Sequence, residues 1–281
     1  MDPFIKASNV VFNYDDGENV LNLDNLNIKQ GEFVSIIGPN GSGKSTFLKC
    51  LNGILLPNGG SVIIDGMDTS DRGRALDIRK IVGLVLQNPD NQIVSSVVCD
   101  DVAFGPENLG LTPSKIKTRV DFALKSVDMY KYKDKQVHKL SGGQKQKVAI
   151  AGIIAMKPKC IVLDEPTSML DPKGRDDVMN VLLKLNKEQN ITVVLVTHFM
   201  EEAALSDRVI LMDKGKVVLS STPKDMFSRV ELLRNYNLSV PIAAKLLYEL
   251  KSLGFKVRND IVNINECIEE ISKLLETKLC H

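Results

Sequence analysis

Eight consecutive residues have the composition and spacing of a phosphate-binding loop. They are Gly38, Pro39, Asn40, Gly41, Ser42, Gly43, Lys44 and Ser45, and they match the pattern G-x-x-x-x-G-K-[ST]. The loop follows the apolar run 33–37 and precedes the helical stretch 45–51, which is the context that the pattern requires. Glycines allow backbone N–H groups to approach phosphate oxygens, and the lysine adds a mobile charge at the β- and γ-phosphates. A glycine-rich turn without a ligand is the alternative interpretation, but the predicted strand and helix favour phosphate binding.

Two adjacent carboxylates, Asp164 and Glu165, follow a second apolar run at 160–163. They therefore stand at the carboxyl end of a predicted strand, where open α/β sheets bind their ligands. We expect Asp164 to hold Mg²⁺ together with the Ser45 hydroxyl, and Glu165 to polarise the water that attacks the γ-phosphate. By itself an acidic pair after a strand is more typical of a solvated turn. The phosphate loop reverses that preference.

A third motif, the pentapeptide Leu140–Gln144, precedes this acidic strand. Its residues Ser141, Gly142, Gly143 and Gln144 resemble the signature motif of ABC ATPases, which other phosphate-loop families lack. Alone it could be a flexible turn that opens a helix. Its order among the other motifs identifies the chain as a member of the ABC family, over roughly residues 4–222.

The remaining elements of the ABC pattern are single residues and one short segment: Tyr14, Gln87, His198 and the segment 168–171. The resemblance implies that Tyr14 stacks on adenine, that Gln87 contacts Mg²⁺ and senses a membrane subunit, and that His198 contacts the γ-phosphate. Without the family pattern, each of these residues would be more typical of core or surface. Only their register with the motifs supports these roles.

The resemblance also implies a composite site for ATP and Mg²⁺ between two subunits. ATP would lie between Tyr14, the loop from Gly38 to Thr46 and Gln87 of one subunit and Ser141–Gln144 of the other. Lys44, Glu165 and His198 would be catalytic, and Ser45, Gln87 and Asp164 would hold the metal. Two departures from the family pattern affect the expected dimer contact rather than the chemistry: Met169 replaces a small residue, and Lys147 replaces an arginine.

Within the superfamily, the segments 87–93 and 100–108 are similar to the energy-coupling-factor group, which includes cobalt-importer ATPases. This similarity implies two ATPase subunits, identical or paralogous, with a membrane coupling subunit and a substrate-binding membrane component. The cargo would be a vitamin, cobalt or nickel, and it would not touch this chain. We expect the segment 88–107 to dock the coupling subunit through Asp90, Asp100, Asp101 and Glu107 beside Ile93, Val94, Val97 and Val98.

The elements that must position these residues follow from hydrophobic patterning. Continuously apolar runs predict strands at 33–37, 81–86, 161–163, 191–196 and 209–212, and continuous apolarity indicates burial on both faces. Helical stretches at 118–127 and 176–187 predict parallel crossover units. The expected fold is therefore an α/β phosphate-loop ATPase core with a parallel sheet, and a hairpin at 213–215 that completes it.

Two further parts are predicted outside that sheet. The interval 88–139 reads as a helical insert, within a helical subdomain of about 88–158. The core domain is expected over 1–222, and an α-rich extension over 223–281. Its apolar residues recur at helical spacing in two groups, 242–250 and 264–275. These two helices could cover the core's own surface or join subunits; the family resemblance favours dimerisation.

Composition and charge exclude several classes of function. Lys and Arg number 36 against 35 Asp and Glu, so no global field attracts nucleic acid, and we expect no nucleic-acid partner. No apolar run approaches the roughly 20 residues that span a bilayer, and no secretory signal begins the chain. We expect a peripheral protein on the cytoplasmic face of the cell membrane. The cysteines, Cys50, Cys99, Cys160, Cys267 and Cys280, predict neither disulfides nor, with His138, His198 and His281, a zinc site.

Three rival functions remain at this level. A soluble ABC protein acting on DNA or ribosomes would need paired cassettes or a long coiled coil. A binding-only cassette would be expected to lose Glu165 or His198, and both are present. The ATPase of another ABC importer or exporter would differ after Gln87 and in the tail.

Overall fold

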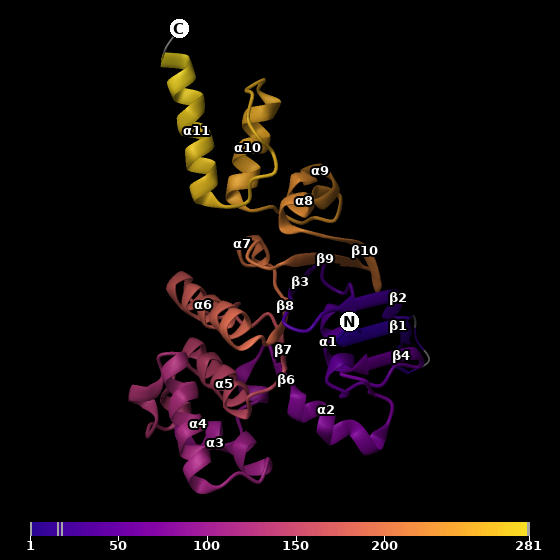
Figure 1. Cartoon of the computed structure of the whole chain (residues 1–281), viewed down its shortest axis with the longest axis vertical. Helices are drawn as coiled ribbons and strands as arrows, with labels where there is room; N and C mark the ends of the chain where they lie inside the picture. The colour runs from indigo at the N-terminus through magenta and orange to yellow at the C-terminus, as the bar shows by residue number, and fades with distance from the viewer. Residues whose placement is uncertain (1, 16, 18, 280–281) are drawn as a thin grey trace.

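A six-stranded sheet occupies the centre of the molecule (Figure 1). The structure is a computed structural model that describes residues 2–15, 17 and 19–279, without the side chains of 276–279. The strand order is β10-β9-β3-β8-β7-β6. The bounds are β3 (Phe33–Ile37), β6 (Val82–Val85), β7 (Cys160–Asp164), β8 (Thr192–Val196), β9 (Arg208–Asp213) and β10 (Lys216–Ser221). All pairs are parallel except β9 with β10, so the expected α/β core is confirmed.

These strands could be predicted from the sequence because both of their faces are buried. Every residue of β3, β6, β7 and β8 is buried, as continuous apolar runs predict. The hairpin between β9 and β10 is also present, with Lys214 and Gly215 at positive φ. Two successive positive φ values are typical of a tight hairpin turn.

A second sheet, which the sequence reasoning missed, lies beside the first. It has the order β2-β1-β4-β5, with β1 (Ile5–Phe12), β2 (Leu21–Ile28), β4 (Gly59–Ile64) and β5 (Met67–Asp68), and its pairs are antiparallel. Its strands alternate buried and exposed residues, and their polar face concealed them from a search for apolar runs. Between the two sheets lies α1 (Lys44–Leu51), inside one hydrophobic core.

The other face of the central sheet is covered by helices. They are α3 (Val98–Asn108), α4 (Pro113–Ser126), α5 (Gly142–Met156) and α6 (Pro172–Gln189), and they share a second core with β7 and β8. The helical subdomain is thus confirmed as part of the fold, whereas its boundaries stay a prediction. The helices expected at 118–127 and 176–187 begin earlier, because Pro113 and Pro172 each occupy a first helical turn.

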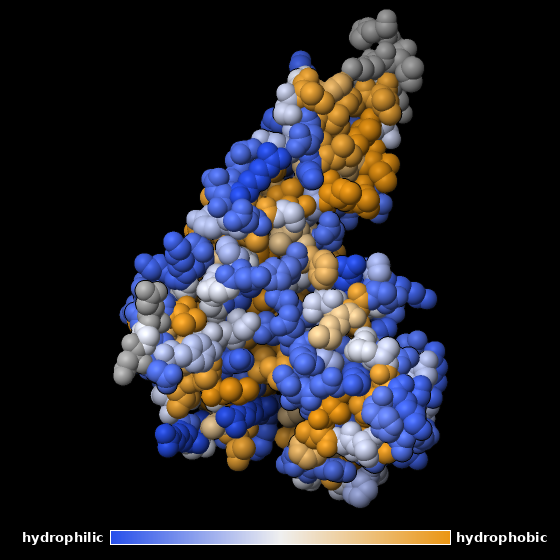
Figure 2. Space-filling model, turned by 180° about the vertical axis from the view of Figure 1, so that it is seen from behind, coloured by the Kyte–Doolittle hydropathy of each residue, from blue (hydrophilic) through white to orange (hydrophobic). Residues whose placement is uncertain are grey.

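The described part of the C-terminal extension contains helices at both predicted positions, 242–250 and 264–275, and two more before them. They are α8 (Pro223–Ser228), α9 (Val230–Asn235), α10 (Ile242–Ser252) and α11 (Ile264–Leu279). The first two helices share a core with β9, whereas α10 and α11 pack mainly around each other. Figure 2 shows apolar side chains gathered on this end of the molecule; those exposed include Ile242, Leu246, Leu253, Ile264, Ile268 and Leu275. Cys280 and His281 lie outside the described residues.

Two short helices complete the fold: α2 (Ala75–Ile81) and α7 (Met200–Ala203). None of the helices in the described part of the chain is long and apolar enough to cross a bilayer.

Candidate functional site

The phosphate loop connects β3 to α1, and its backbone geometry requires glycine at two positions. At Gly38, φ is 155°, and a Cβ there would lie 2.1 Å from the carbonyl oxygen of Met212. At Gly43, φ is 95°, and a Cβ would lie 2.7 Å from the carbonyl oxygen of Val20. No L side chain fits either position. The two glycines therefore allow the chain to turn tightly into the helix N-terminus, where free N–H groups favour anions.

The ammonium group of Lys44 is folded back over this loop. Its Nζ donates to the carbonyl oxygens of Gly38 and Pro39, both at 2.8 Å. Burial lowers the pKa of Lys44, while the negative charges of Glu165 and Asp164 oppose that shift. The loop thus holds a desolvated positive charge that phosphate oxygens could attract away from the carbonyls.

Ser45 and Asp164 come together across the loop and the end of β7. The Ser45 hydroxyl donates to Asp164 Oδ1 at 3.0 Å, and burial raises the pKa of this carboxyl group. A hydroxyl and a carboxylate beside a phosphate cradle fit Mg²⁺, which takes oxygen ligands and is usually held by one or two protein groups plus phosphates. No group of three or more acidic, His or Cys side chains that could hold a metal occurs among the described residues.

Glu165 lies at the centre of a second contact, between Gln87 and His198. Its Oε1 lies 2.7 Å from His198 Nε2, and its Oε2 accepts from Gln87 Nε2 at 2.9 Å. Glu165 has φ of 47°, a left-handed conformation that non-glycine residues rarely adopt and that clusters at functional sites. The structure therefore brings together the three residues that the sequence placed after three different strands.

Tyr14 lies beside the helix that follows the loop. Its hydroxyl is 3.2 Å from Thr46 Oγ1, its ring meets Phe12 edge-on, and about half of its surface is exposed. An exposed ring fixed by two contacts next to the phosphate loop could stack on a base.

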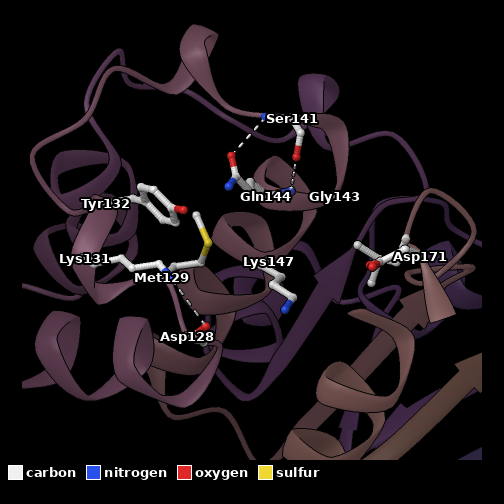
Figure 3. Close-up of a pocket in the computed structure, with 10 residues that line it drawn as sticks. Asp128, Met129, Lys131, Tyr132, Ser141, Gly143, Gln144, Lys147 and Asp171 are labelled. Carbon is white, nitrogen blue, oxygen red and sulfur yellow. Dashed lines mark hydrogen bonds and ion pairs between the residues drawn. The ribbon is translucent and has the colours of Figure 1, made fainter. Parts of the chain in front are cut away.

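The signature residues begin α5 and face a separate pocket (Figure 3). Ser141 caps the helix by accepting from Gln144 N at 3.3 Å, and Gln144 Oε1 accepts from Ser141 N at 3.1 Å. These two hydrogen bonds use the backbone N–H groups of Ser141 and Gln144. The N–H groups of the two glycines between these residues remain at the helix N-terminus. The pocket, of about 200 Å³, is lined by Ser141, Gly143, Gln144, Lys147, Asp171 and neighbours, and by no residue of the phosphate loop.

The two departures from the family pattern lie near this pocket. Met169 is exposed, so its side chain is available to a second subunit. Lys147 Nζ pairs with Asp177 Oδ2 at 3.1 Å, a single contact where an arginine could form two. Both observations concern the face around the signature rather than the phosphate loop.

The segment expected to dock a membrane partner needs one correction. Asp101 and Val98 are buried: Val98 belongs to the hydrophobic core, and Asp101 Oδ1 accepts from the backbone N–H groups of Val94 at 2.7 Å and Ser95 at 3.0 Å. Asp101 therefore shapes the turn before α3 and cannot meet a partner. The residues of this segment that remain exposed include Asp90, Val94, Asp100, Phe104 and Glu107, and Asp90 pairs with Lys145 at 2.7 Å.

Sequence reasoning also missed three buried polar side chains that lie close in the chain to Glu165 or His198. Thr167, Thr197 and Glu202 are all buried, although none belongs to a motif considered above. Their only signal in the sequence was proximity to Glu165 and His198.

Sequence comparisons agree with this geometry. A profile described as ABC transporter matches residues 21–168. The energy-coupling factor transporter ATP-binding protein EcfA1 of Caldanaerobacter subterraneus is 55% identical over 273 residues, covering 96% of this chain and 99% of that protein. EcfA1 of Clostridioides difficile is 52% identical over 277 residues, covering 98% and 100%.

Solved structures give the same fold. The structure of cbiO1 from Clostridium perfringens, described as part of the ABC transporter complex cbiONQ, matches with a TM-score of 0.75 and 41% identity, covering 84% of this chain and 95% of that chain. A dimeric ABC cassette in a post-hydrolysis state, bound to ADP and Pi, matches with a TM-score of 0.72 and 36% identity, covering 78% and 98%.

Proposed function

The chain belongs to the ABC transporter family as an ATP-hydrolysing subunit of the energy-coupling-factor type, and we propose that it hydrolyses ATP at a site completed by a second ATPase subunit. The observation that carries the proposal is the position of Glu165 between Gln87 and His198, next to a phosphate loop that holds Lys44. A general base must reach the proton of the attacking water, and a half-buried carboxylate, oriented by two contacts beside phosphate charge, satisfies that requirement.

In this proposal each side chain has a distinct task. Lys44 leaves the carbonyls of Gly38 and Pro39 for the β- and γ-phosphates, where it stabilises charge in both ground and transition states. Glu165 accepts the proton of water, and His198 turns from Glu165 towards the γ-phosphate. Tyr14 stacks on adenine, with its hydroxyl held by Thr46.

Mg²⁺ would be held by Ser45 and Asp164, with Gln87 beside them, and would neutralise phosphate charge when bound. The amide nitrogen of Gln87 donates to Glu165. Its amide oxygen is the atom suited to a cation or to its hydration shell.

The second half of the site comes from the signature of another subunit. Within one chain, the pocket at Ser141–Gln144 contains no phosphate-loop residue, so the N-terminus of α5 is available to a nucleotide bound elsewhere. Its glycine N–H groups suit the γ-phosphate. Dimeric cassettes among the structural relatives support this arrangement.

We place the membrane partner on the exposed part of 88–107. Val94 and Phe104 are exposed apolar side chains, and the acids Asp100 and Glu107 accompany them. Such a surface suits a basic amphipathic helix of a coupling subunit, at the cytoplasmic face of the membrane. The proposed cargo of the assembly, bound by another membrane component, is a vitamin or a cobalt or nickel ion.

The test of docking is charge reversal at Asp100 and Glu107 in the full chain co-expressed with its membrane partners. We expect the double variant to lose co-purification yet keep its ATP affinity and melting temperature. Because Asp101 is buried, it is left intact. An unchanged complex would refute the assigned surface.

We propose that the extension over 223–281 contributes to association with the second ATPase subunit, identical or paralogous. The exposed residues Leu246 and Ile268 lie on the apolar face of α10 and α11, while α8 and α9 complete the core. Leu246→Glu with Ile268→Glu should therefore weaken self-association without unfolding the chain, as sedimentation and thermal melting would report. If association is unchanged, the extension only covers the surface of its own domain.

A further inference from the structure

A buried carboxylate lies behind the proposed catalytic pair without belonging to it. Glu202, in α7, is 5% exposed. Its Oε2 accepts from the Thr197 hydroxyl at 2.6 Å, and the Thr197 oxygen in turn accepts from Phe199 N at 3.0 Å. Thr197 directly precedes His198, so these bonds hold the backbone on both sides of the histidine.

Glu202 also lies near Thr167, in the segment that carries Glu165. Glu202 Oε1 and Thr167 Oγ1 are both buried, and neither has a hydrogen-bond partner in the described part of the chain. The Thr167 hydroxyl is nevertheless close enough to lower the pKa of Glu202, against the larger upward effect of burial. A small rotation that paired Thr167 Oγ1 with Glu202 would satisfy both buried groups. Thr167 lies two residues after Glu165.

A third element reaches the same place. Arg175, in α6, has its guanidinium 4.1 Å from the centre of the Phe199 ring, and its charge lowers the pKa of Glu202. Asp171 caps this helix, so α6 begins directly after the segment 168–171, where Met169 is exposed.

Burying a carboxylate is costly unless its hydrogen bonds are made. Close to Glu202, the backbone N–H of Glu165 donates to Val196 O at 2.9 Å, and Glu165 holds an unfavourable left-handed conformation. The segments that carry the two catalytic side chains therefore both approach a single buried carboxylate.

We propose that Glu202 is a positioning residue, which holds Glu165 and His198 in register for ATP hydrolysis through the hydroxyl groups of Thr197 and Thr167. The proposal rests on the proposed function above. Glu202 contacts neither the nucleotide nor the water, and its effect is on the orientation of the groups that do.

The test is steady-state ATP hydrolysis by full-length variants, at a chain concentration where the rate per molecule no longer rises. Glu202→Ala should lower kcat by about 10- to 100-fold, the scale of a misplacement near 1 Å, while KM for ATP changes little. Glu202→Gln should restore most of the rate, because its amide can accept from Thr197 and donate to Thr167. The control is Glu201→Ala, the exposed neighbour on the same helix, which should behave like the wild type.

A double variant separates positioning from general damage. In the background of Glu165→Gln, Glu202→Ala should cause little further loss, because it acts through a group already removed. Wild-type turnover by a folded Glu202→Ala variant, or full additivity with Glu165→Gln, would overturn the proposal. If Glu202→Ala does not fold, Thr197→Val removes one arm of the contact and must show the same loss of kcat. Should Glu165→Gln itself hydrolyse normally, the proposed function fails instead.

Discussion

Glu165→Gln removes the proposed base while keeping the size of the side chain. The carboxylate faces two donors, His198 Nε2 at 2.7 Å and Gln87 Nε2 at 2.9 Å. A glutamine offers only one acceptor oxygen, so one of the two donors loses its partner. Loss of a general base typically costs about 10²- to 10⁴-fold in rate. At about 1.4 kcal/mol per decade, that is roughly 3 to 5 kcal/mol of transition-state stabilisation.

The same substitution should not weaken the binding of ATP. Glu165 lies close enough to Lys44 to influence its pKa, and its negative charge repels the γ-phosphate. ATP affinity should therefore be unchanged or increased in Glu165→Gln, and ATP should persist in the bound state. Single-turnover phosphate release and equilibrium nucleotide binding measure the two effects separately, with Glu201→Gln as the matched control. Near-normal hydrolysis, or a parallel loss of binding and turnover, would refute the assigned role.

Three further predictions concern binding and stability. Lys44→Ala should weaken ATP binding itself, measured by equilibrium titration, because its ammonium group contacts phosphate charge before the reaction; unchanged affinity would contradict this. Asp101→Asn should lower the free energy of unfolding by about 1 to 3 kcal/mol in urea titration, because it weakens a buried acceptor of two backbone N–H groups, whereas the exposed Asp100→Asn should not. Asp164→Asn should raise the melting temperature of the nucleotide-free chain at pH 7 while weakening Mg²⁺-dependent ATP binding. The melting temperature should rise because burial raises the pKa of Asp164, so that its ionised form destabilises the folded chain. This destabilisation is complete above the pKa of Asp164 in the folded chain, and it shrinks as pH falls from there towards the ordinary value of 3.8. A lower melting temperature would contradict that.

Residues that lie close together in the chain were the most predictable part of the site. The phosphate loop needs only one strand, one turn and one helix, and all eight of its residues lie where the pattern predicts. Asp164 and Ser45 meet because the carboxyl ends of parallel strands share one edge of a sheet. The same rule brings Gln87 and His198 to Glu165.

What the sequence could not indicate depends on long-range contacts and on the direction of single side chains. The strands β1 and β2 alternate buried and exposed residues. Their exposed polar residues make the two segments resemble loops in the sequence. Asp101 and Asp100 are chemically identical neighbours on α3, and only the fold shows which one faces the backbone of Val94. Glu202 and Glu201 are likewise chemically identical neighbours. Only the packing of α7 against β3 shows which of the two side chains points inward.

We propose that hydrolysis belongs to a pair of subunits, since the pocket beside the signature of one chain is lined by no residue of its own phosphate loop. The most direct test is the rate of ATP hydrolysis per molecule, measured with the chain and any ATPase subunit that co-purifies with it, from dilute to saturating protein. A second-order regime at low concentration, followed by a plateau, is expected, and Ser141→Arg should abolish the plateau rate while leaving ATP binding intact. A rate per molecule that stays constant at all concentrations down to those where the protein is monomeric would contradict the account.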